Sequence, residues 1–172
     1  MAKKKSSSKK GFGLAKILYL VAAVLGVVAV VMLFVDNVKV PDTDLGILGT
    51  VEGTGYTGLQ VAFGSSEKDV EVLAFSFMAL LPYLLVIGGV VLSALGAFAK
   101  KGSKILDYVS IALYVVAGVL FFIMPNFMVF ADTLLGVAAS KLEYVLTTGA
   151  VVAAVCSLLS GATVLVKNLL KK

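Results

Sequence analysis

Four long apolar runs alternate with polar segments along the chain. The runs cover residues 17–35, 73–99, 108–131 and 144–166, and none of them contains a charged side chain. An α-helix rises about 1.5 Å per residue and the hydrocarbon core of a bilayer is about 30 Å thick, so about 20 residues are enough to cross it. The pattern predicts an all-α membrane protein, with a four-helix transmembrane bundle over residues 17–166.

The two ends of the chain are basic tails, at residues 1–16 and 167–172. The first tail holds six lysines among serines and glycines, a composition that cannot bury a core, and we expect it to be disordered. A basic segment before an apolar run is also typical of a cleavable signal peptide. The run at 17–35 is too long for one and offers no small-residue cleavage motif, so we expect an uncleaved membrane anchor.

Residues 36–71 form the only long polar segment, with seven acidic side chains against two lysines. Within it, Leu59, Val61 and Phe63 fall on one face of an extended chain, and glycines precede them. We therefore expect a small β-hairpin of residues 47–51 with residues 56–63 on the outer face of the bundle. Loops longer than about 15 residues are usually functional or disordered, which makes this loop the first place to look for a partner. The candidate interaction residues are Asp42, Asp44, Tyr56, Leu59, Val61 and Phe63.

The distribution of lysine predicts the orientation. If both termini are cytoplasmic, twelve of the fifteen lysines lie on the inner side, whereas nine of the ten acidic residues lie on the outer side. Lysine bias in short loops sets the topology of membrane proteins. We expect a multi-pass protein of the cell membrane with both termini in the cytoplasm.

Small residues and prolines mark features inside the spans. Small residues spaced four apart share one face of a helix and let two helices approach closely, either within one bundle or between subunits. Prolines remove a backbone donor and bend or interrupt a helix. The helix-packing candidates are Gly89, Ser93 and Ala97 in the second span and Gly149, Ala153, Ser157 and Gly161 in the fourth. The predicted kinks are at Pro82 and at Pro125 with Asn126.

Composition leaves little room for catalysis. The chain is 60% hydrophobic and has no His, Arg or Trp, so it lacks the commonest metal ligand and the usual general base near neutral pH. No Ser/His, paired-Asp or metal constellation is evident, and no ionisable residue falls inside a predicted span, where carriers need one. We therefore expect no enzymatic activity, no cofactor, no small-molecule substrate and no nucleic-acid partner.

Two motifs in the acidic segment have ordinary interpretations. Gly53, Gly55 and Gly58 match the spacing of a dinucleotide-binding loop, but the strand and helix that such a site needs are not predicted around them, so we assign them to turns. The acids between Asp42 and Glu71 do not follow the spacing of a calcium-binding loop. A solvated acidic surface is the simpler interpretation.

The segments GLQVAFG (58–64) and FSFMALLPYLL (75–85) resemble those of a group of small uncharacterised four-span membrane proteins from low-GC Gram-positive bacteria and their wall-less relatives. This resemblance covers the outer loop and the second span, and it implies a bacterial plasma membrane without implying an activity. The plan of four spans, inner termini and a long first outer loop is also similar to that of the claudins. The match is one of topology, because the tryptophan and paired cysteines of the claudin loop are missing.

These features favour a non-enzymatic structural or interaction protein in the lipid bilayer, which forms a homo-oligomer or binds a membrane-protein partner through its outer loop. A different class also fits the sequence. Hydroxyl groups on the fourth span and an acidic outer vestibule could build an oligomeric channel that favours cations. The chain could also be an accessory subunit of a larger membrane complex.

Overall fold

The computed structural model describes residues 13–44, 50–51, 53–67, 69–98 and 104–170. Four long helices dominate it: α1 (Leu14–Val31), α3 (Phe77–Phe98), α4 (Lys104–Phe122) and α6 (Thr148–Leu169). A 3-10 turn, η1 (Met32–Phe34), extends α1. All four helices are long and apolar enough to cross a membrane, which confirms the expected all-α membrane bundle and a multi-pass protein.

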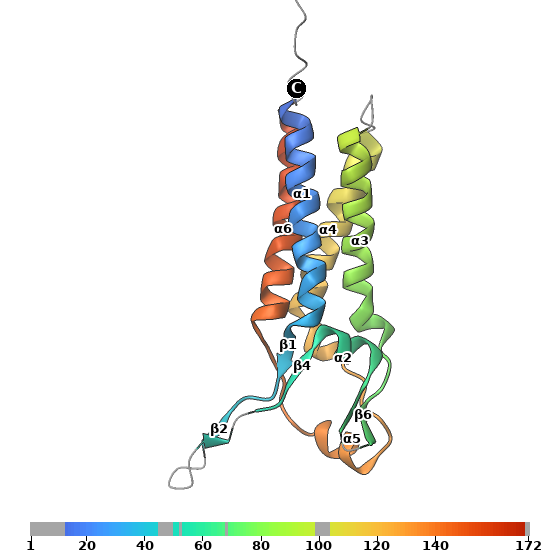
Figure 1. The fold of residues 1–172 in the computed structure, drawn as a ribbon, viewed down its shortest axis with the longest axis vertical. Coiled ribbons are helices and arrows are strands. Elements are labelled where there is room, and N and C mark those ends of the chain that lie inside the picture. Colours follow the sequence, from blue (N-terminus) through green and yellow to red (C-terminus); the bar gives the residue numbers. More distant parts are fainter. Residues whose placement is uncertain (1–12, 45–49, 52, 68, 99–103, 171–172) are drawn as a thin grey trace, which may run out of the picture.

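The four helices run side by side and alternate in direction (Figure 1). Helix α1 packs against α3 and α6, and α4 packs against the same two helices. The start of α1 and the end of α6 therefore lie at one end of the bundle. The segments between α1 and α3 and between α4 and α6 meet at the other end, where they form a cap (residues 123–147 and the described part of 36–76) (Figure 1).

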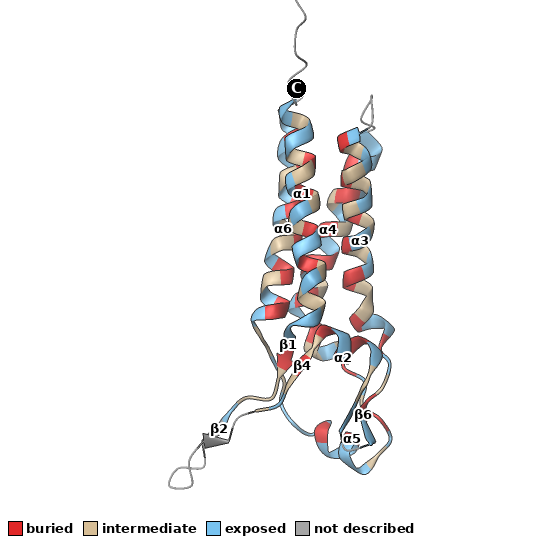
Figure 2. Ribbon diagram, viewed as in Figure 1, coloured by how far each residue is buried: buried red, intermediate tan, exposed pale blue. Residues whose placement is uncertain are grey.

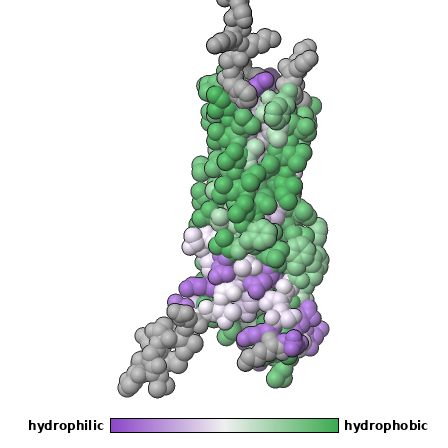
Figure 3. Space-filling model, in the orientation of Figure 1, coloured by the Kyte–Doolittle hydropathy of each residue, from purple (hydrophilic) through white to green (hydrophobic). Residues whose placement is uncertain are grey.

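Burial follows the helix faces that meet inside the bundle (Figure 2). The interior holds large aromatic side chains, including Tyr83, Tyr114 and Phe121, among alanines, glycines and serines. The outward faces carry exposed Val, Leu and Ile along their length, and Figure 3 shows the band that they form. An apolar outer surface of this kind is solvated by lipid tails, so the bundle holds together through close packing and internal hydrogen bonds.

The cap is built from short strands and helices. Strand β1 (Asp36–Lys39) lies between β4 (Gly55–Thr57) and β7 (Val145–Leu146) and pairs with both in antiparallel fashion. Two further antiparallel pairs join β2 (Thr43–Asp44) to β3 (Thr50–Val51) and β5 (Ser65–Glu67) to β6 (Val70–Leu73). The remaining elements are α2 (Gly58–Phe63), η3 (Met124–Phe127) and α5 (Leu134–Ala139).

The predicted hairpin of residues 47–51 with 56–63 is wrong where the structure describes it. Residues 50–51 pair with β2, β4 pairs with β1, and α2 takes the place of the second half of the predicted strand. The reason is a capping box: the Thr57 hydroxyl accepts a hydrogen bond from the Gln60 N–H, and the Gln60 side chain accepts one from the Thr57 N–H. This pair satisfies two backbone donors and starts a helix. Residues 47–49 lie outside the described part of the chain.

The structure also moves the boundaries of the last two predicted spans. The third span was expected to continue to residue 131, but α4 ends at Phe122 and η3 follows it. The fourth was expected to begin at residue 144, whereas residues 145–146 pair with β1 and α6 begins at Thr148. Hydropathy alone does not distinguish a buried strand in the cap from the first turns of a transmembrane helix.

The predicted proline features fall in two different settings. Pro82 lies inside α3, which continues through it from Phe77 to Phe98. Pro125 occupies the first turn of η3, where its missing N–H would have had no helical partner, and the Asn126 N–H donates to the Ile123 carbonyl. The Pro125 interruption therefore marks the place where the chain leaves the bundle for the cap.

Candidate functional site

A buried ion pair joins three helices at the end of the bundle where α1 begins. The Lys167 ammonium, in the last turn of α6, donates to Oδ2 of Asp107, in the first turn of α4. It also donates to the Tyr19 hydroxyl of α1 at 2.6 Å, and that hydroxyl donates to Oδ1 of Asp107. Lys167 is 1% exposed and Asp107 4%. Both charges are thus compensated by each other and by the tyrosine, and we call the three residues the ionic triad.

The ionic triad corrects the expectation that the spans hold no ionisable residue. Asp107 and Lys167 each lie one position outside the predicted runs, and α4 and α6 extend far enough to include them. An acid in the first turn of a helix and a base in the last turn both interact favourably with the helix dipole. Opposite charges placed next to the ends of two apolar runs are the sequence signal that could have indicated the pair.

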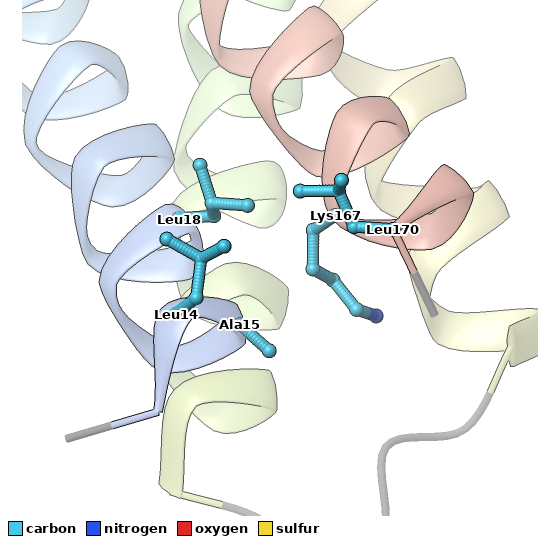
Figure 4. A pocket seen from close by; sticks show the side chains of 5 residues that line it. All are labelled: Leu14, Ala15, Leu18, Lys167 and Leu170. Carbon is cyan, nitrogen blue, oxygen red and sulfur yellow. The ribbon is translucent and has the colours of Figure 1, made fainter. Parts of the chain in front are cut away.

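A small cavity borders the ionic triad between α1 and α6. Figure 4 shows its walls, in which Leu14, Ala15 and Leu18 face Lys167 and Leu170. Its volume of about 100 Å³ is well below the 300–1,000 Å³ of ordinary ligand pockets. The walls are apolar except for the Lys167 side chain, whose ammonium is held by the triad. The geometry suits a structural clamp better than a substrate site.

Tyr114 occupies the middle of the bundle and connects α4 to the other three long helices. Its hydroxyl contacts Ser93 Oγ of α3 at 3.3 Å and donates to the Ala22 carbonyl of α1 at 3.4 Å. The Ser157 hydroxyl of α6 donates to the Tyr114 carbonyl at 2.8 Å. Hydrogen bonds between helices hold a bundle together where the surrounding lipid provides no hydrophobic driving force.

All seven helix-packing candidates are buried inside the bundle. A methyl group added at Gly89 would lie 2.8 Å from the Tyr114 ring, and one at Gly161 would lie 3.3 Å from its Cβ. A methyl group at Gly149 would collide with the Asp36 carbonyl of the cap. These positions make room for neighbouring elements of the same chain, so their small side chains are used within the subunit. The seven are Gly89, Ser93, Ala97, Gly149, Ala153, Ser157 and Gly161.

Of the five hydroxyl residues considered as a pore lining, Thr147, Ser157, Ser160 and Thr163 have partners within the chain, whereas Thr148 is exposed. Ser160 donates to the Cys156 carbonyl at 2.8 Å, and Thr163 donates to the Leu159 carbonyl at 2.7 Å. The Thr147 hydroxyl donates to the Asp36 carbonyl of β1. Ser157, as described above, bonds to α4. These groups reinforce the subunit itself, and they do not form a free polar face.

Asn37 anchors the cap to the bundle. Its side-chain amide donates to the carbonyls of Met32 and Val35 at 2.8 and 2.9 Å, and its main-chain carbonyl accepts from the Thr147 N–H at 3.0 Å. The Asn37 side chain is fully buried, close to the Gly58 backbone of α2. The Asn37 side chain thus ties β1 to the end of α1, and the main chain of the same residue ties β1 to the start of α6, which fixes the cap on the bundle.

The six interaction candidates between α1 and α3 include both buried and exposed residues. Tyr56 and Val61 belong to the core, and burial, followed by the charge of Glu67, raises the pKa of Tyr56. Leu59 and Phe63 are exposed on α2, which lies against the end of the bundle. The two acids, Asp42 and Asp44, occupy the β1–β2 region.

Asp42 is bound within its own loop. Its carboxylate accepts from the Gly53 N–H at 2.9 Å and pairs with Lys39 at 3.5 Å. These two interactions, the hydrogen bond first, lower the pKa of Asp42. Asp44 lies opposite Thr50 in the pairing of β2 with β3. No group of three or more acids, cysteines or histidines is placed to hold a metal ion among the residues that the structure describes.

An exposed apolar surface lies at the far end of the cap, in the segment between the third and fourth predicted spans. Helix α5 presents Leu134, Leu135 and Val137, and Leu142 follows it. Leu134 is 90% exposed, more than any other large apolar side chain described. We call these four residues the distal tip. Figure 3 shows apolar surface beside hydrophilic residues at this end, beyond the apolar band of the bundle.

Two hydrogen bonds hold the distal tip on the cap. The Thr133 hydroxyl accepts from the Gly136 N–H at 3.0 Å, which caps α5, and donates to the Glu71 carbonyl of β6 at 2.6 Å. The Tyr144 hydroxyl donates to the Ala139 carbonyl at the end of α5 at 3.0 Å. Burial, and then the neighbouring Tyr56, raises the pKa of Tyr144 to about 12. The tip is therefore an ordered surface.

Comparisons with known proteins do not extend this picture. No protein-family profile, no curated protein and no solved structure matches the chain. The functional argument therefore depends on the geometry described above.

Proposed function

We propose that this chain is a non-enzymatic membrane protein that binds a partner protein through its cap, on the outer side of a cell membrane. The lysine distribution supports this orientation, because the tails and the α3–α4 connection carry most of the basic residues. The observation that carries the proposal is the distal tip: large apolar side chains are exposed in the cap, beyond the ends of the four long helices.

The distal tip differs from the other apolar surfaces of the molecule. The exposed valines and leucines of the bundle are solvated by lipid, whereas the tip lies beyond the ends of the helices (Figure 3). Burying a leucine side chain contributes about 1.5–3 kcal/mol, so four neighbouring apolar residues offer a substantial contact energy to a partner. Exposed apolar patches that lie in water mark interaction sites on proteins.

The alternative of an oligomeric channel has less support in the geometry. Its proposed hydroxyl lining bonds to backbone within the subunit, and the small-residue faces pack inside the bundle. Association through the cap remains compatible with an accessory role in a larger membrane complex. We therefore place the functional contact on the cap and assign the bundle to anchoring it.

Site-specific photo-crosslinking in native membranes tests the proposal. A photoreactive phenylalanine analogue replaces Leu134 at the tip or, as a control on the same side of the membrane, Asp42 in the first outer loop. We expect one adduct of defined mass from position 134 and none from position 42. The crosslinked protein, identified by mass spectrometry and then purified, should bind the chain in nanodiscs and should lose about tenfold or more in affinity to a Leu134→Asp variant.

Two outcomes contradict the proposal. The first is an adduct from position 42 without one from position 134, which would return the contact to the first outer loop. The second is a purified partner that binds the wild type and the Leu134→Asp variant equally well, since a charge placed in a buried apolar contact is costly.

A further inference from the structure

We infer that the partner contacts the distal tip with a basic amphipathic segment, one whose apolar face covers the leucines and whose Lys or Arg side chains reach the acids around them. This inference rests on the proposed function and specifies the chemistry of the partner at the same surface.

The shape of the tip favours a helical or extended segment over a small molecule. Its apolar residues project from a short helix and the chain that follows it, and no described cavity is lined by them. Amphipathic segments bind such surfaces by placing apolar side chains at intervals of three or four residues against them. The exposed Leu134 and Val137 lie three positions apart and so present one face of α5 to such a segment.

The acids around the tip specify the sign of the partner's charge. Asp132 and Glu143 flank the segment that contains α5 and are exposed. Glu71 is exposed on β6, and its main-chain carbonyl accepts the hydrogen bond from Thr133. Glu67 and Asp69 are exposed in the same β5–β6 hairpin. Against these five acids stand Lys141 and, outside the described residues, Lys68. Complementary charge around an apolar centre speeds association and excludes partners of the wrong charge.

The same charges argue against two other occupants. A second copy of the tip would bring its own acids against these, and like charges facing each other are unfavourable. An opposing membrane with anionic lipids would be repelled for the same reason, because anionic surfaces attract basic segments. A basic amphipathic segment combines the apolar contact with charge complementarity.

A peptide binding experiment on the full chain in zwitterionic nanodiscs tests the inference. The probe is a helical peptide of about 18 leucine and lysine residues, fused to a soluble carrier protein, and its matched control replaces every lysine with glutamate. Empty nanodiscs give the background from lipid. We expect the Leu/Lys probe to bind and the Leu/Glu probe to bind at least about tenfold more weakly.

Variants separate the two contributions to binding. Leu134→Asp should lower the affinity for the Leu/Lys probe by about tenfold or more. The double variant Asp132→Asn with Glu143→Gln should lower this affinity by about threefold and make it less dependent on salt. Equal binding of the two probes, or no effect of the neutralising pair, would overturn the inference. Binding of plain vesicles to the tip, or dimerisation of the nanodisc protein that Leu134→Asp abolishes, would also overturn it.

A failure of this inference can be distinguished from a failure of the proposed function. If position 134 crosslinks to a partner that the Leu/Lys probe does not displace, the tip is an interaction site and only the chemistry assigned to its partner is wrong. If position 134 gives no adduct in native membranes, the proposed function itself fails, whatever the peptide does.

Discussion

Single residues decide how closely the four helices approach. Tyr114 reaches α1, α3 and α6 by hydrogen bonds, and glycines on α3 and α6 provide the space for it. Asp107 and Lys167 in turn place two opposite charges in a buried position where each depends on the other. Both arrangements predict strong effects of small changes.

Gly89→Ala should destabilise the bundle by about 1–3 kcal/mol, because the new methyl group would lie 2.8 Å from the Tyr114 ring and force a shift. The neighbouring Gly88→Ala is the control, since its methyl group would meet only the flexible end of Leu113 at 3.3 Å. A thermal scan that follows the reaction of a thiol dye with the single cysteine, Cys156, measures both variants in detergent. Equal melting temperatures for the two would contradict the packing account.

Lys167→Met should destabilise the fold by about 3–5 kcal/mol, because it leaves the Asp107 carboxylate buried without its partner. Adding Asp107→Leu to this variant should recover most of the loss, since an apolar pair of similar volume often replaces a buried ion pair without cost. Lys104→Met, at an exposed position on α4, serves as the control. The same thermal scan measures all of them, and a double variant no more stable than the single one would contradict the clamp.

The cap should lose stability at alkaline pH. The folded state raises the pKa of Tyr144 to about 12, above the value of about 10 of an unfolded tyrosine. Its contribution is therefore complete below pH about 10 and is lost as pH rises towards 12, where a tyrosinate can no longer donate to Ala139. Unfolding followed by circular dichroism should show a smaller alkaline loss for Tyr144→Phe. An identical pH profile for the two proteins would contradict this prediction.

At the scale of elements, Thr133 connects two parts of the cap, because its hydroxyl caps α5 and also bonds to β6. Loss of a helix cap costs about 1 kcal/mol. Thr133→Val should therefore loosen the distal tip and weaken partner binding, whereas Thr133→Ser keeps the hydroxyl and should behave like the wild type. Hydrogen exchange of the α5 amides measures the difference, and equal protection in the two variants would show that the cap bond is not needed.

Sequence patterns predicted the long helices far better than the cap. Uncharged runs of sufficient length identified four spans, because each helix must be apolar on every face that meets lipid. The strands of the cap contain two to four residues each and pair across distant parts of the chain, for example Lys39 with both Gly55 and Val145. Such pairs are not visible in a local sequence pattern. Because β7 is apolar, hydropathy placed it in the predicted fourth span.

The candidate site was predictable only in part. The small residues of α3 and α6 could be recognised by their spacing of four, since this spacing defines one helix face. The ionic triad could be recognised only in its Asp107–Lys167 pair, from opposite charges next to the ends of two apolar runs, because nothing in the sequence pairs Tyr19 with residues 88 and 148 positions away. The distal tip could not be recognised from the sequence, because leucines next to a membrane span fit equally well with a longer span or with a segment along the membrane surface.

At the scale of the whole molecule, the account requires the cap to face outwards. In a background with Cys156→Ala, we expect a membrane-impermeant maleimide to label Asp42→Cys in intact cells and to label Lys104→Cys only after the membrane is permeabilised. The physical reason is the concentration of lysine in the tails and the α3–α4 connection, which predicts that these segments face the cytoplasm. The reverse pattern of labelling would invert the orientation.

The central claim is that the distal tip is covered by a partner in its native membrane. The most direct measurement uses Leu134→Cys in a background with Cys156→Ala. It compares the rate of labelling by a maleimide in native membranes with the rate in purified nanodiscs, and Asp42→Cys in the same background is the reference. We expect labelling at position 134 to be about tenfold slower in native membranes, while the rate at position 42 stays the same. Equal rates at position 134 in the two preparations would show that the tip is uncovered and would contradict the account.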